Sequence, residues 1–139
     1  MYQEKVVLTA PPGTPVGGQA VSADRDWPIF VVSLADALSR RAPLLGQLGS
    51  MGLEHEVVAA VDGRRGLPPD CEKYIDRAGT ILNLGRKMAD AEYACALSHH
   101  SIYRRILDGG LPGALVLEDD ALLQPGVAGF VASGAYRSG

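Results

Sequence analysis

The chain has 139 residues, of which 47% are hydrophobic and 21% are charged, and its formal net charge is -3. This length suits one domain with its own core. The small acidic surplus argues against nucleic-acid partners, because binding to phosphates requires a basic surface. Two cysteines, Cys71 and Cys95, are too few for a disulfide framework or a metal cluster. No apolar run reaches the roughly 18 residues of a membrane-spanning helix. We therefore expect a soluble, cytoplasmic α/β domain.

The first part of the chain predicts a leader followed by a strand. Residues 1–27 are rich in proline and glycine between positions 11 and 18, which breaks any regular period. We therefore expect a poorly structured leader over 1–27, with at most an isolated short strand at 5–9, and a folded domain over 28–139. The continuous apolar run 29–34 is typical of a central parallel strand that is covered on both faces.

A helix and a second strand follow. Ser39 is the expected N-cap, Pro43 would fall in the first turn, and Gly52 would end the helix. Leucines at 44, 45 and 48 form its apolar stripe. The run 56–61 predicts a second buried strand, so that the first third of the domain is a βαβ unit. For residues 64–89 we expect a long connection with one helical turn around 71–77.

The clearest helical period covers residues 90–107. Its apolar stripe contains His99 at the centre and Cys95, which we expect to be a buried small hydrophobe; Glu92 and Ser98 flank the stripe. Glycines at 109 and 110 end the helix. The run 114–117 predicts a third buried strand, and Glu118-Asp119-Asp120 follows directly. Beyond it, the last nineteen residues predict only a weak element.

Three consecutive acids after a buried strand are the strongest chemical signal. Open α/β sheets bind ligands outside the carboxyl ends of their strands, so these side chains would project into that crevice, and Asp62 after the second strand would face it too. Adjacent carboxylates repel one another unless a cation neutralises them. A hard divalent ion that bridges carboxylates and a diphosphate would do so. The alternative is an exposed acidic turn without a ligand.

Two other enzyme or signalling classes do not fit. A phosphorelay receiver domain carries its acids after an early strand and needs a lysine far downstream, for which no chain remains. A hydrolase built on Ser98 and His99 fails because neighbouring side chains on a helix do not face each other, and no nucleophile elbow is present.

Five segments in order resemble family-25 glycosyltransferases, the lipopolysaccharide-biosynthesis and collagen galactosyltransferase group. They are 29–34, Arg40-Arg41, 59–63, 91–99 and 115–120, together spanning residues 29 to about 123. The resemblance implies a GT-A-type, Rossmann-like and mostly parallel sheet flanked by helices, which binds a nucleotide sugar. It also implies transfer of a hexose, with galactose favoured, from a UDP-sugar to a lipopolysaccharide or lipooligosaccharide acceptor in a bacterium.

The resemblance also implies a site. By analogy Asp120 is the direct ligand of a divalent metal, Mn²⁺ or else Mg²⁺, and Asp119 contacts the metal and the ribose or sugar. The remaining donor-binding residues would line the uracil and ribose side, lie near the base or build the pocket floor: Ser33, Leu34, Arg40, Asp62, Glu92, Ser98, His99 and Glu118. The metal would act as a Lewis acid on the leaving diphosphate.

The sequence departs from the family pattern in three places. The first strand ends in Ser33-Leu34 where the family has Asn-Leu, about twenty-seven residues precede that strand, and the chain ends soon after the acidic motif. We therefore expect an N-terminal donor-binding part, with the catalytic base beyond its end. The alternative is a truncated, non-catalytic remnant that serves as a nucleotide-sugar-binding or interaction module.

The sequence also permits a homodimer and peripheral contact with a membrane. An exposed sheet edge would permit a homodimer. The adjacent arginine pairs leave peripheral contact with the inner membrane open, against the simpler interpretation of a solvated surface. A plain sugar-binding protein is disfavoured, because the one tryptophan, Trp27, falls in the predicted leader.

Overall fold

The computed structural model describes residues 27–137, so the predicted leader lies outside the described residues except for Trp27. Within this range the chain forms two compact units. One consists of residues 61–97. The other, made of residues 27–60 and 98–137, contains the sheet.

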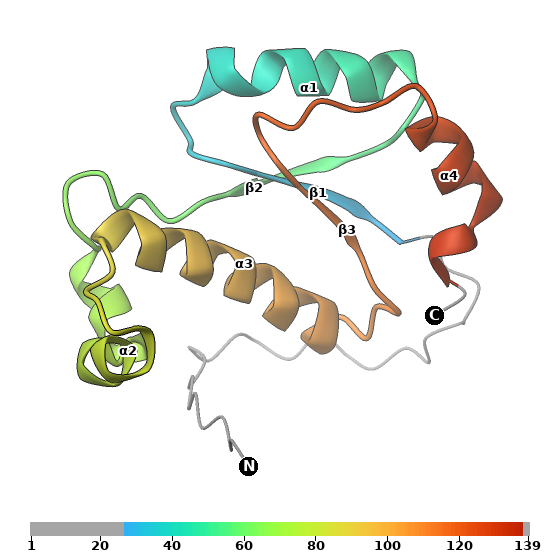
Figure 1. Cartoon of the computed structure of the whole chain (residues 1–139). Helices are drawn as coiled ribbons and strands as arrows, with labels where there is room; N and C mark the ends of the chain where they lie inside the picture. The colour runs from blue at the N-terminus through green and yellow to red at the C-terminus, as the bar shows by residue number, and fades with distance from the viewer. Residues whose placement is uncertain (1–26, 138–139) are drawn as a thin grey trace. The chain divides into compact units, whose positions relative to one another are not determined.

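The sheet has three parallel strands in the order β2-β1-β3. They are β1 (Ile29–Ser33), β2 (Glu56–Ala59) and β3 (Leu115–Glu118). The chain runs from central β1 to β2 on one side and returns to β3 on the other, so the strand order reverses between β1 and β3 (Figure 1). An α/β fold with a parallel sheet flanked by helices is confirmed. The reversal is the point where open α/β sheets bind ligands.

Alternation along β1 divides the core between the two faces of the sheet. Ile29 and Val31 pack with Leu44 and Leu48 of α1 (Leu38–Ser50) on one face. Phe30 and Val32 pack against Ile102 on the opposite face. Figure 1 shows α1 over one face of the sheet. All five residues of β1 are buried. The predicted central strand, covered on both faces, is therefore confirmed.

The helix α1 begins earlier than the sequence predicted. Its N-cap is Ala37, so Ser39 is the second helical residue and caps nothing. Consequently Pro43 lies inside the helix rather than in its first turn. The predicted stop is confirmed: Gly52 has a positive φ of 66°, and Leu53 N–H donates to the Leu48 carbonyl at 3.0 Å. Together with the bond from the Gly52 N–H to the Gly49 carbonyl at 3.1 Å, it forms the pair of hydrogen bonds that define a Schellman end.

The strand β2 pairs in the predicted place but is not buried. Three of its four residues are exposed, and Val57 is 36% exposed. An apolar run looks the same in a central strand and at an edge, and among the described strands β2 pairs only with β1. Glu56 on this strand forms an ion pair with Arg105 at 2.7 Å.

The unit of residues 61–97 contains more helix than the sequence predicted. The expected helical turn is present as η1 (Pro69–Tyr74), and α2 (Arg77–Leu84) follows it within the segment predicted as connection. Asp76 caps α2 by accepting the Gly79 N–H at 2.8 Å, and Gly85, with φ 67°, ends it. An Asp and a Gly bracketing eight residues were the available signal.

The helix α3 (Asp90–Asp108) matches the predicted helix, but its residue Cys95 is exposed rather than buried. After β3 the chain forms α4 (Val127–Ser133) and η2 (Ala135–Arg137). The ring of Trp27 lies 5.0 Å from that of Tyr136, centroid to centroid. None of the helices between residues 27 and 137 is long and apolar enough to cross a bilayer.

Candidate functional site

A buried carboxylate joins the carboxyl ends of β1 and β3. Asp119, the first residue after β3, is only 6% exposed, and Ser33 at the end of β1 is 2% exposed. The Ser33 hydroxyl donates to Asp119 Oδ2 at 2.8 Å. Hydrogen bonds to a carboxylate compensate for part of the cost of burying its charge. The place where the sequence has serine instead of the family's asparagine is therefore a polar contact within the site.

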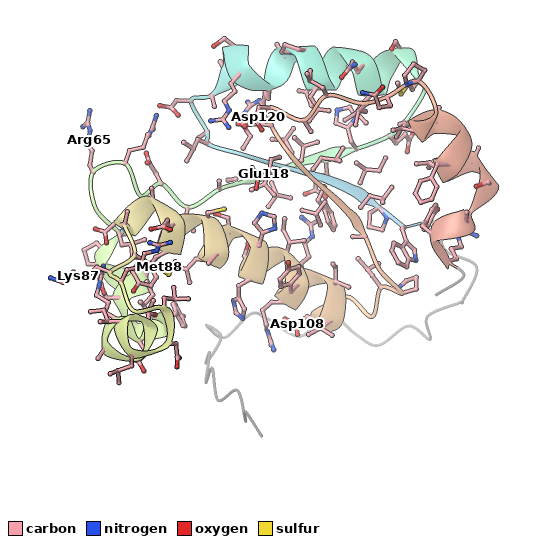
Figure 2. All side chains as sticks on the ribbon, in the orientation of Figure 1. Arg65, Lys87, Met88, Asp108, Glu118 and Asp120 are labelled. Carbon is pink, nitrogen blue, oxygen red and sulfur yellow. The ribbon has the colours of Figure 1, made fainter. Side chains whose placement is uncertain are left out.

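Arg40, in the first turn of α1, contacts both Asp119 and Asp120. Its Nε lies 2.8 Å from Asp119 Oδ1, and its Nη2 lies 2.6 Å from Asp120 Oδ2. The Asp120 side chain is 57% exposed, whereas that of Asp119 is 9% exposed. Figure 2 shows Asp120 on the α1 side of the sheet. One guanidinium thus bridges two carboxylates and reduces the repulsion between them.

Arg41 also belongs to this cluster, although the sequence predicts no site role for it beyond its place in the Arg40-Arg41 pair. Its Nη1 donates to Ser33 Oγ at 3.3 Å and to the Leu34 carbonyl at 3.1 Å. The available signal was its place beside Arg40 in a segment that resembles the family. The two arginines therefore contact different groups: Arg40 binds the acids, and Arg41 binds the end of β1.

The third acid faces a different partner. Glu118 Oε1 lies 3.4 Å from His99 Nε2, and the two side chains are 57% and 27% exposed. His99, predicted at the centre of an apolar stripe, is thus half-buried and next to an acid. Ser98, its neighbour on α3, is 2% exposed. Figure 2 labels Glu118 and Asp120 at the same end of β3.

The loop after the acidic motif is held by α1. The Ala121 N–H donates to the Glu118 carbonyl at 3.0 Å and closes a turn around the two aspartates. Gln47 then bonds Leu123 twice: its Nε2 donates to the Leu123 carbonyl at 3.2 Å, and its Oε1 accepts the Leu123 N–H at 3.1 Å. These bonds fix the direction in which the acids leave the sheet.

The chemistry of this donor set suits a cation. Asp119 and Asp120 present oxygens that converge on one positive group, as the contacts of Arg40 show. Convergent carboxylate oxygens are the ligands that hard divalent cations take. The two aspartates at the carboxyl ends of β1 and β3 thus offer oxygen ligands of the kind that a divalent cation takes, with the Ser33 hydroxyl and the Arg40 guanidinium beside them.

Asp62 belongs to the unit of residues 61–97 and is held by its neighbour. Arg64 donates to it from Nε at 2.9 Å, from Nη2 at 2.7 Å and from its backbone N–H at 3.0 Å. The side-chain bonds, followed by the backbone bond, lower the pKa of Asp62 to about 2. A Cβ at Gly63 would lie 2.6 Å from the Asp90 carbonyl oxygen, so only glycine fits there.

Glu92, in the same unit, closes the N-terminus of α3. Its Oε2 accepts the Ala89 N–H at 2.8 Å, which is the contact that the third helical residue makes in a capping box. Arg86 donates to both oxygens of Glu92, at 2.7 and 3.0 Å. The side-chain bonds from Arg86, followed by the Ala89 bond, lower the pKa of Glu92 to about 2. Its local role is thus helix capping.

The structure therefore brings most of the predicted site residues together in the unit that contains the sheet. Asp62 and Glu92 lie in the other unit. The residues that the sheet-containing unit groups at the ends of β1 and β3 are Ser33, Leu34, Arg40, Asp119 and Asp120, with the Glu118–His99 pair and Ser98 alongside.

These features define a class: an α/β domain with a charged cluster at the carboxyl ends of parallel strands, where the strand order reverses. The profile described as glycosyltransferase family 25 (LPS biosynthesis protein) matches residues 26–133. The chain therefore belongs to glycosyltransferase family 25.

The relatives of this chain include vertebrate proteins named as inactive and bacterial glycosyltransferases. The rat protein named "Probable inactive glycosyltransferase 25 family member 3" is 37% identical over 99 residues, which cover 66% of this chain and 17% of the rat protein. LgtB of Neisseria meningitidis serogroup B, a lacto-N-neotetraose biosynthesis glycosyltransferase, is 32% identical over 107 residues, which cover 76% of this chain and 37% of LgtB. LgtE of Neisseria gonorrhoeae is also 32% identical over 107 residues, covering 76% of this chain and 36% of LgtE. The chain thus spans little more than a third of these relatives, or less.

The lowered pKa of Glu92 makes the α3 cap dependent on pH. Because the carboxylate is stabilised in the folded state, its contribution is complete above its unfolded pKa and disappears as the pH falls through the folded value of about 2. We expect Glu92→Gln to be less stable than wild type at neutral pH, with the difference shrinking from about pH 4.5 downward. Urea unfolding of both proteins between pH 2 and 7 measures this difference in the free energy of unfolding. A difference independent of pH would contradict the role of the charge.

Proposed function

We propose that this chain forms the donor-binding part of a glycosyltransferase that transfers a hexose, with galactose favoured, from a UDP-sugar to a lipopolysaccharide or lipooligosaccharide acceptor. The observation that carries the proposal is the cluster in which Ser33, Arg40, Asp119 and Asp120 meet at the ends of β1 and β3. Membership in family 25 and the reaction for which LgtB is named support the reaction class.

In this proposal the acids hold a divalent ion, Mn²⁺ or else Mg²⁺, with Asp120 as the direct ligand and Asp119 at the ion and the sugar or ribose. When bound, such an ion supplies Lewis-acid stabilisation of the leaving diphosphate. Ser33, Leu34 and Arg40 line the uracil and ribose side. The proposal rests on the convergence of the two aspartates on one positive group.

The remaining predicted donor contacts enter the proposal with different support. His99 and Glu118 contact each other in the sheet-containing unit, and buried Ser98 precedes His99. Glu92 has a capping role, and Asp62 is held by Arg64. Their contacts with the donor stay predictions, as do peripheral membrane contact and self-association through a sheet edge.

A second function has its own support. A chain that keeps the fold and binds a nucleotide sugar without transferring it is favoured by the 37% identity to a relative named as probably inactive. The two functions share the donor site and differ in turnover.

Ligand binding tests the shared donor site. We expect UDP to raise the melting temperature only when Mn²⁺ is present, because the ion joins the acids to the diphosphate. A ligand at 100 times its dissociation constant stabilises the folded state by about 2.7 kcal/mol, an easily measured shift. Asp120→Ala should abolish this shift. Asp108→Ala is the matched control, since Asp108 is an exposed aspartate paired with Arg104 and lies well away from Asp120 in Figure 2.

A folded wild-type chain that neither UDP nor Mn²⁺ stabilises, alone or together, would contradict the donor site. An equal loss in Asp120→Ala and Asp108→Ala would show that the loss is not specific to the acidic motif.

Transfer of radiolabelled galactose from UDP-galactose to lipooligosaccharide separates the two functions. The glycosyltransferase proposal expects incorporation that Mn²⁺ stimulates and that Asp120→Ala removes. Binding of UDP and Mn²⁺ without incorporation would favour the non-catalytic function for this chain, while leaving the donor site in place.

A further inference from the structure

Arg40 occupies the position between the two aspartates that a cation would take. Its Nε and Nη2 contact one oxygen of Asp119 and one of Asp120, at 2.8 and 2.6 Å. The other oxygen of Asp119 already accepts the Ser33 hydroxyl. Both oxygens of the buried acid therefore have a partner, and the guanidinium stands where the two acids converge. A metal ion that joined both acids would compete with the guanidinium for that place.

The guanidinium is the partner that can leave. The Arg40 side chain is 56% exposed, and its pair with the exposed Asp120 is of the weak surface kind. Its pair with the buried Asp119 can break only when another cation takes the place of the guanidinium. The Ser33 hydroxyl, in contrast, is buried between β1 and β3. Arg41 would stay in place, because it binds Ser33 Oγ and the Leu34 carbonyl rather than the acids.

We propose that Arg40 is an internal counter-ion that exchanges with the divalent cation: the guanidinium holds Asp119 and Asp120 when the cation is absent and moves to the diphosphate of the donor when the cation binds. This inference rests on the proposed function, since it assumes that the acids take a metal ion. A guanidinium and a divalent cation repel each other, so binding of both at the same carboxylate oxygens is unfavourable.

The exchange gives Arg40 two alternative anionic partners, and it moves the expected contact of Arg40 from the uracil and ribose side to the adjoining diphosphate. A planar guanidinium fork binds phosphate oxygens as well as it binds carboxylates. Arg40 is the third residue of α1, which follows β1, so its side chain extends from the backbone at the edge of the sheet where the acids lie. Metal and nucleotide should therefore bind cooperatively, because the ion releases the group that binds the diphosphate.

Cooperativity of this kind is reciprocal: the metal strengthens nucleotide binding by the same factor as the nucleotide strengthens metal binding. Binding of the metal alone is weakened, because the ion must first displace Arg40. The chain thereby selects the metal–nucleotide pair over either ligand alone.

Calorimetric titration of the full chain with Mn²⁺ alone, UDP alone and both together tests the exchange. Typical coupling between two sites is about 5- to 150-fold. We therefore expect Arg40→Gln to bind Mn²⁺ alone about 5-fold or more tightly than wild type, and to show a coupling between Mn²⁺ and UDP that is smaller by at least the same factor. Arg104→Gln is the matched control, since it removes the same charge from an ion pair with Asp108 on α3.

Arg40→Lys keeps the charge but not the two-pronged contact, so it should lie between wild type and Arg40→Gln. A measurement without substitution is available as well: the ¹⁵N-labelled Nε–H signal of Arg40 should shift when Mg²⁺ and UDP are added to wild type, and the corresponding signal of Arg104 should not.

Unchanged or weaker Mn²⁺ binding by Arg40→Gln, together with normal Mn²⁺–UDP binding by wild type, would overturn the exchange while the donor site stood. An Arg40 Nε–H signal that does not shift at saturating Mg²⁺ and UDP would overturn the exchange too. If neither wild type nor Arg40→Gln bound Mn²⁺ or UDP, both the exchange and the proposed function would be overturned.

Discussion

The carboxylate of Asp119 is the charge on which the arrangement of the site depends. It is almost fully buried, and a charge in that position is tolerated only with close, well-placed partners. Those partners come from two other elements: Ser33 from the end of β1 and Arg40 from α1. Pairing this one charge therefore joins the ends of two strands to the helix that follows the first. The neighbours of Asp119 in the chain, Glu118 and Asp120, are both exposed, so the motif combines one fixed acid with two accessible ones.

Local patterns made part of this arrangement predictable. The apolar run at 29–34 identified the central strand, the leucine stripe and Gly52 identified α1, and the acids after the third strand identified the edge where the cluster forms. Each of these signals lies within a few residues of chain. The family resemblance added the expectation that Arg40 belongs to the same site.

The rest depends on contacts that no local pattern encodes. The bond between Arg40 and Asp119 joins residues far apart in the chain, and nothing in either segment specifies that distance. The exposure of β2 follows from its place in the sheet, which an apolar run does not reveal. Cys95 lies on a predicted apolar stripe yet is exposed, because a helical period gives the stripe and not what covers it. Glu92 accepts the Ala89 N–H at the start of α3, and no sequence signal marked this role, because alanine is not a usual N-cap residue.

The relatives of this chain include proteins named as glycosyltransferases and proteins named as inactive. The rat relative named as probably inactive is 37% identical, and LgtB, named for lacto-N-neotetraose biosynthesis, is 32% identical over a similar stretch. Identity over this segment therefore does not separate a donor-binding site that supports transfer from one that does not. The Ser33–Asp119–Arg40 cluster gives this chain a defined chemical feature that can be tested directly, whichever outcome holds.

The most direct test of the central claim is paramagnetic broadening of backbone amide signals by Mn²⁺ in the ¹⁵N-labelled chain, with UDP present and Mg²⁺ as the diamagnetic reference. The account predicts that broadening is concentrated at the carboxyl ends of β1 and β3, over residues 33–41 and 118–121. The signals around Asp108 should survive. Broadening centred elsewhere, or none at saturating UDP, would contradict the claim that this acidic cluster is the donor site.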